Sequence, residues 1–132
     1  MTDATLNADV VIIGAGPVGM ALAGALRGNQ RVLLIDRRPR GAWASDPRVL
    51  AVAHGSRQLL ERLKAWDSGS ATPIRDIHVS QRGGFGRTRI LADDYSLPAL
   101  GYVMRYCDLA ATLDLRLDNE QLLSSSEVID VQ

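Results

Sequence analysis

The fold of this chain is most constrained by a group of glycines between two apolar stretches near the N-terminus. A β-branched stretch, residues 10–13, precedes the glycines, and an alanine- and leucine-rich stretch, residues 18–27, follows them. A second apolar stretch, residues 31–35, comes next and ends at Asp36. β-branched runs favour strands, whereas small and straight-chain residues favour helices. The segment therefore predicts a strand, a tight turn, a helix and a second strand, which is the layout of a βαβ unit.

The glycines of the turn have the spacing GxGxxG, and each has a separate role in such a unit. Gly14 allows the tight turn, Gly16 lets a pyrophosphate approach the backbone, and Gly19 lets the helix pack closely on the strand. Asp36 lies about 20 residues further on, where a carboxylate can accept hydrogen bonds from an adenosine ribose. A plain βαβ unit with a glycine-rich turn would leave Gly16 and Asp36 without a role. The sequence therefore predicts a site for the ADP half of a dinucleotide, and the expected contacts in the turn are Gly14, Ala15, Gly16, Pro17, Val18 and Gly19.

A basic stretch, residues 37–40, follows Asp36 directly. Its arginines could bind the 2′-phosphate of NADP, but Asp36 would then face that phosphate as a like charge. The site therefore favours FAD or NAD over NADP, and Arg37 is a further candidate cofactor contact. Exposed charge runs are most often solvated, so a solvated loop is the alternative for these arginines.

Charge and composition argue against several other classes of protein. Residues 10–26 carry no charge, but the glycines and Pro17 among them would break a membrane-spanning helix. No lysine or arginine precedes them, unlike in a secretory signal. The 15 basic and 15 acidic residues give zero net charge, so nothing favours a nucleic-acid partner. Because Cys107 is the only cysteine, we expect no internal disulfide and no cysteine-based metal cluster, and we expect a cytoplasmic protein without a metal site.

A second helix is predicted over residues 56–66, with Ser56 as its N-cap. Its apolar positions, Leu59, Leu60, Leu63 and Trp66, lie on one helical face. Arg48 precedes this helix, in an extended run that ends at His54. An arginine there could bind a pyrophosphate through bidentate hydrogen bonds, or it could form a surface salt bridge.

The middle of the chain predicts a β-hairpin, with strands over residues 74–80 and 87–91. The glycine-rich stretch between them is a turn and not a phosphate loop, because no helix follows it. Residues 101–106 predict a further strand.

The last third of the chain predicts a helix from Asp108, as N-cap, to about Leu117. Its leucines also alternate with charged residues, which fits a half-buried strand equally well. Residues 127–131 predict a final extended segment.

These residues together resemble a known family, the FAD-dependent aromatic hydroxylases related to p-hydroxybenzoate hydroxylase. Residues 9–26, 31–39 and 46–66 are similar to the FAD-binding opening of that family. The run 77–103 is similar to its ubiquinone-biosynthesis branch, in particular to the 2-octaprenyl-6-methoxyphenol hydroxylases.

The resemblance implies a Rossmann-like α/β fold that binds FAD, with a parallel sheet and an additional β-hairpin. Residues 1–132 would be the N-terminal part of one FAD-binding domain. It implies FAD as cofactor, NAD(P)H as its reductant, and O2 and a polyprenylated phenol as substrates of the parent enzyme. It also leaves open a peripheral association with the inner membrane or with a biosynthetic complex.

Carried over by residue, the resemblance places the pyrophosphate at the glycine turn, the ribose at Asp36 and FAD contacts at Arg48 and Arg105. The family segments that hold the flavin ring have no counterpart among these residues, so we expect the 132 residues alone to be inactive and predict no catalytic residue. His54, His78 and the acidic pair 93–94 are expected to be structural or solvated. Two alternatives stay open, an NAD-linked dehydrogenase with the same opening motif and an inert structural fragment.

Overall fold

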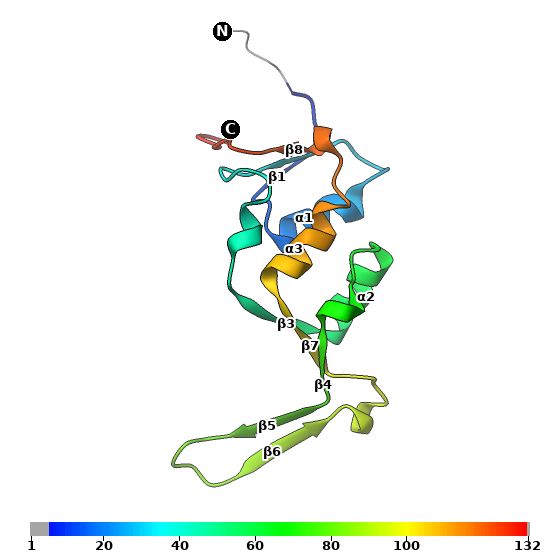
Figure 1. Ribbon diagram of the computed structural model, residues 1–132, viewed down its shortest axis with the longest axis vertical. Coiled ribbons are helices and arrows are strands. Elements are labelled where there is room, and N and C mark those ends of the chain that lie inside the picture. Colours follow the sequence, from blue (N-terminus) through cyan, green and yellow to red (C-terminus); the bar gives the residue numbers. More distant parts are fainter. Residues whose placement is uncertain (1–5, 132) are drawn as a thin grey trace.

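The computed structural model describes residues 6–131, and strands from near both ends of this range form a parallel sheet of three strands (Figure 1). The strand order is β1-β2-β8, with β1 at Val10–Ile13, β2 at Val32–Ile35 and β8 at Leu122–Leu123. Helix α1, Pro17–Leu26, connects β1 to β2. This confirms the predicted βαβ unit and the α/β fold with a parallel sheet.

The core lies where α1 and α3, Tyr106–Asp114, pack together beside this sheet. Its residues include Leu34 from β2, Met20 and Ala23 from α1, and Leu113 from α3. α1 contributes small residues to this contact, which allows the two helices to approach closely. The short strands are therefore stabilised by helix packing rather than by length.

A second sheet is antiparallel and has the order β3-β7-β4. Its strands are β3 at Val49–Ala53, β7 at Gly101–Arg105 and β4 at Thr72–Ile74. At Gly101 a Cβ atom would lie 2.9 Å from the carbonyl oxygen of Val52, so this pairing needs a glycine. The strand at β7 and an extended run at β3 were expected, but β4 as a separate strand was not. The pairing of the three strands into an antiparallel sheet was not expected either, because the partners are far apart in the sequence.

Helix α2 spans His54–Arg62, so the prediction of a helix over residues 56–66 was wrong at both ends. It begins directly after β3, with Ala53 rather than Ser56 as its N-cap. It ends early because Lys64 adopts a φ of 56°, in the left-handed region. The expected apolar face is also incomplete, since Leu60 is buried while Leu59 is exposed.

Helix α3 spans Tyr106–Asp114, which confirms a helix and rules out the alternative of a strand. Its N-cap is Arg105, so the expectation of Asp108 as N-cap was wrong, and Asp108 lies in the first turn. The leucines after the helix do not form a strand. Leu113, inside α3, is 1% exposed, and Leu115, just after it, is 77% exposed. The alternation reflects the helix end and the turn that follows it.

The predicted hairpin is confirmed as β5, Asp76–Ser80, paired with β6, Arg87–Leu91. It projects away from the two sheets (Figure 1). The single strand expected over residues 74–80 is divided in two, because Ile74 pairs with β7 while Asp76 pairs with β6.

The final extended segment expected over residues 127–131 is not a strand in the structure. The strand that completes the parallel sheet is instead β8, whose register is set by its pairing with β2. Among residues 6–131 no helix has both the length and the apolar character needed to cross a bilayer. Short 3-10 helices complete the structure at Ala42–Ser45, Ser68–Ser70, Asp93–Tyr95 and Asn119–Gln121.

Candidate functional site

The glycine turn between β1 and α1 is packed so tightly that two of its positions require glycine. Gly14 has a φ of 106°, which side chains with a Cβ rarely adopt. A Cβ on Gly19 would lie 2.0 Å from the carbonyl oxygen of Gly14, so the first turn of α1 lies directly against the turn. These are steric reasons of the kind that the sequence motif predicted for both residues.

Gly16 is the N-cap of α1, and it has no side chain to cap the helix. Pro17 follows at the first helical position, where its missing N–H is not needed. The N-terminus of α1 therefore has no side-chain cap, and a helix N-terminus favours an anion such as phosphate.

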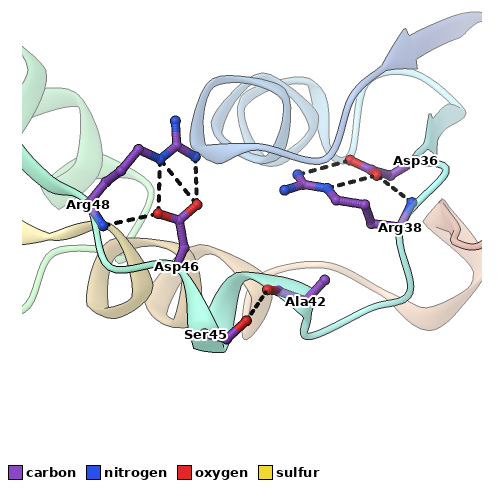
Figure 2. Close-up of polar contacts among 6 residues, drawn as sticks. All are labelled: Asp36, Arg38, Ala42, Ser45, Asp46 and Arg48. Atoms are coloured by element: carbon purple, nitrogen blue, oxygen red, sulfur yellow. Dashed lines mark hydrogen bonds and ion pairs between the residues drawn. The ribbon is translucent and has the colours of Figure 1, made fainter.

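Asp36 joins the end of β2 to this turn. Its carboxylate accepts hydrogen bonds from the backbone N–H of Ala15 at 2.8 Å and of Arg38 at 2.7 Å. The Arg38 guanidinium adds two longer contacts, of 3.3 and 3.4 Å (Figure 2). Burial by itself would raise the pKa of Asp36, but these hydrogen bonds from Arg38 and Ala15 outweigh it and the pKa lies below its ordinary value. The group is therefore an ionised acceptor at neutral pH.

An open cavity of about 370 Å³ lies beside Asp36 and the turn. Gly14, Arg37 and Arg38 line it together with residues 126–128. Sequence reasoning missed Ser126, Glu127 and Val128 as lining residues, because it predicted residues 127–131 only as an extended segment. No motif marks them, and only the return of the chain to β2 through β8 brings them here.

Arg48 lies just before β3, and its guanidinium pairs with Asp46 at 2.7 Å (Figure 2). The same guanidinium lies over the Tyr106 ring, 4.2 Å from the ring centroid. The hydroxyl of Tyr106 in turn lies 3.5 Å from the position that a Cβ on Gly16 would take. Arg48 thus forms a salt bridge, which was one of the two expectations for this residue. Its contact with Tyr106 also brings it close to the glycine turn, as the other expectation, a contact with a pyrophosphate, requires.

The two remaining candidate arginines differ in their surroundings. Arg37 lines the cavity beside Asp36. Arg105 is an exposed residue whose guanidinium pairs with Asp108 at 2.8 Å, and it is not among the residues that line the cavity. Of the predicted cofactor contacts, the structure therefore brings together the turn, Asp36, Arg37 and, through Tyr106, Arg48.

The site as a whole has the chemistry that an ADP group needs. The turn offers open backbone and a helix N-terminus for phosphates, and Asp36 offers an acceptor for ribose hydroxyls. The cavity next to Asp36 offers space for a base. The residues present therefore fit the ADP half of a dinucleotide.

Comparison with known proteins gives an independent view of the same region. A family model described as FAD binding domain matches residues 7–114. That range includes the glycine turn, Asp36 and Arg48, and it ends with α3.

Two curated relatives are ubiquinone hydroxylases. Ubiquinone hydroxylase UbiM of Neisseria meningitidis is 35% identical over 82 residues, which cover 57% of this chain and 18% of the relative. Ubiquinone hydroxylase UbiL of Rhodospirillum rubrum is 38% identical over 82 residues, which cover 58% and 19%. The chain thus spans less than a fifth of the length of these relatives. They agree with the expected ubiquinone-biosynthesis branch, while the narrower resemblance to the 2-octaprenyl-6-methoxyphenol hydroxylases stays a prediction.

Among solved structures, the chain is similar to RebC-10x, described as native and K252c-bound. The TM-score is 0.59 and the sequences are 27% identical, over 92% of this chain and 26% of that one. The similarity therefore covers nearly all of this chain and a minor part of the solved structure.

Proposed function

Because the chain belongs to the FAD binding domain family, we propose that its glycine turn and Asp36 bind the ADP half of FAD in a flavin-dependent monooxygenase. The observation that carries the proposal is the link between the two parts, the hydrogen bond from Ala15 N–H to the Asp36 carboxylate. It holds the ribose acceptor beside the phosphate turn before any ligand arrives. The family match favours FAD over the NAD-linked dehydrogenase that the motif alone left open.

Asp36 can accept a ribose without losing its contacts to the backbone. A carboxylate has about four acceptor positions, and the two shortest bonds at Asp36 come from backbone N–H groups. The contacts from the Arg38 guanidinium are longer and better suited to exchange. We therefore expect ribose hydroxyls to replace the Arg38 side chain while Ala15 stays bonded.

The remaining assignments complete the ADP site. Residues 14–19 would hold the pyrophosphate, with Arg48 and Arg37 as further contacts, and the cavity formed with residues 126–128 would take the adenine. Arg105 remains a weaker candidate, because it is exposed and paired with Asp108.

For the whole protein we propose hydroxylation of a polyprenylated phenol with NAD(P)H and O2, as in ubiquinone biosynthesis. The names of the two ubiquinone hydroxylase relatives support this assignment. When bound, FAD supplies the redox chemistry, while the residues of this chain bind and orient it. We propose that residues 1–132 are the N-terminal part of the FAD-binding domain, and that they are inactive alone. A polyprenylated substrate partitions into bilayers, so we also propose a cytoplasmic protein that works at the surface of the inner membrane, alone or in a biosynthetic complex.

Cofactor extraction from the full-length protein tests the proposal. Copurifying flavin, seen as a yellow protein and identified after heat release, is the expected result. Tight binding of NADH with no affinity for FAD would contradict the proposal and support the dehydrogenase.

Titration of FAD and ADP into the 132-residue chain tests the fragment itself. We expect weak binding, because the part of the family that holds the flavin ring is absent from these residues. No signal at millimolar ligand would support an inert structural fragment.

A further inference from the structure

Tyr106 is a buried residue beside the glycine turn to which the sequence motif assigns no role. It begins α3 at the end of β7, and its side chain belongs to the core, with 5% exposure. Its backbone N–H donates to the carbonyl oxygen of Arg48 at 2.8 Å, which continues the β3–β7 pairing by one residue. Its hydroxyl lies 3.5 Å from the position that a Cβ on Gly16 would take. The backbone thus holds the phenol group directly against the N-cap of α1.

Two arginines lie close to this phenol group. The Arg48 guanidinium lies 4.2 Å from the centroid of the Tyr106 ring, and Figure 2 shows the side chains of Arg38 and Arg48 extending toward the same region. Asp36 raises the pKa of Arg38 and Asp46 raises that of Arg48, and the interaction of each arginine with Tyr106 adds to the increase. In the structure each arginine pairs with an aspartate, Arg38 with Asp36 and Arg48 with Asp46.

The two guanidinium groups near the Tyr106 hydroxyl leave its proton available for a hydrogen bond. A guanidinium has only donors, so neither Arg38 nor Arg48 can accept the hydroxyl proton of Tyr106. The first-turn N–H groups of a helix are also donors. A phosphate oxygen at the turn would be the acceptor that this arrangement of donors suits.

We propose that Tyr106 donates its phenolic hydrogen bond to the pyrophosphate of the bound cofactor, and is therefore a cofactor-binding residue opposite the glycine turn. This inference rests on the proposed binding of FAD. It extends the phosphate site from the βαβ unit to the junction of β7 and α3, the last element that the family match reaches.

The test compares ADP with adenosine in the full-length protein and in its Tyr106→Phe variant, with affinities measured by calorimetry. Only ADP carries the pyrophosphate, so the variant should lose about tenfold in affinity for ADP and none for adenosine. Tyr102→Phe is the matched control, because Tyr102 is a buried tyrosine of β7 whose hydroxyl bonds to Arg57 instead. It should leave both affinities unchanged.

The outcomes separate the inference from the proposed function. An unchanged affinity for ADP in Tyr106→Phe, or an equal loss for ADP and adenosine, would overturn the role of Tyr106. If the unmodified protein bound neither FAD nor ADP, the proposed function itself would be wrong.

A second measurement needs no variant of Tyr106. In the unmodified protein with carbon-13 labelled tyrosine, the phenolic carbon signal of Tyr106 should shift on addition of ADP and stay in place with adenosine. The same response to both ligands would contradict direct contact with the pyrophosphate.

Discussion

Replacement of Asp36 by Asn is the sharpest perturbation of the candidate site. Asparagine keeps the shape of the side chain but removes its charge and one of its two acceptor oxygens. Asp36 now accepts from two backbone N–H groups, those of Ala15 and Arg38. The variant can satisfy one of them with its carbonyl oxygen, while its NH2 group faces the other as a second donor.

The expected size of the effect follows from the burial of this carboxylate. Its side chain is 10% exposed, so solvent screens it little. A hydrogen bond to a charged group contributes about 1.5 to 3 kcal/mol, and this corresponds to roughly ten- to a hundredfold weaker binding of FAD. The unliganded protein should also lose about 1 to 2 kcal/mol of folding stability, because a backbone N–H at the turn becomes unsatisfied.

The assay is quenching of FAD fluorescence on titration with full-length apoprotein, repeated with Asp36→Asn. Asp9→Asn is the matched control, since Asp9 pairs with Arg31 just before β1 and does not line the cavity. FAD affinity that is unchanged in Asp36→Asn, or reduced equally in Asp9→Asn, would refute the assignment of the ribose to Asp36.

Three further predictions concern packing, phosphate contact and pH. Gly19→Ala should destabilise the fold by about 1 to 3 kcal/mol in thermal melts, because its Cβ would lie 2.0 Å from a backbone oxygen. In the control Gly24→Ala the new Cβ has its nearest neighbour at 3.9 Å and should be tolerated, so equal melting temperatures of the two variants would contradict the packing argument. Arg48→Ala should weaken ADP binding and reduce its salt dependence, since its guanidinium lies over the ring of Tyr106, whose hydroxyl lies beside Gly16. The effect should exceed that of Arg105→Ala, which removes an ion pair with Asp108 away from the cavity, and the reverse order in salt titrations would reject this. The pKa of Asp9 is lowered to about 2, chiefly by its side-chain hydrogen bond with Arg31, so the stabilising effect of this ion pair is present above the ordinary pKa of 3.8 and is lost as pH falls toward 2. The melting temperatures of the unmodified protein and of Asp9→Asn should therefore converge over that pH range, and a constant difference would show that this ion pair plays no part.

The elements that sequence reasoning found correctly are those whose signals are local. The βαβ unit from β1 to β2 carries its own pattern, with glycines where the backbone needs them and apolar strands on either side. The hairpin β5–β6 likewise has its turn residues between its two strands. Helix boundaries were less accurate, because α2 begins where β3 ends and not at the residue with the best capping side chain.

The parts that were missed depend on contacts between distant segments. The antiparallel sheet forms because β7 pairs with both β3 and β4, and β8 is a strand only because β2 offers it an edge. A two-residue strand has no periodicity of its own. For the same reason residues 126–128 gave no sign that they line the cavity.

The sequence by itself therefore determined the glycine turn, the acidic residue at the end of β2 and the likeness to FAD-dependent hydroxylases. These depend on residue types at short spacings, where covalent geometry limits what the chain can do. Only the tertiary structure decided what surrounds them, including Tyr106 against Gly16, Arg48 over its ring and residues 126–128 across the cavity. These contacts arise when β7, α3 and β8 pack against the βαβ unit, and packing between distant segments leaves no spacing in the sequence to read.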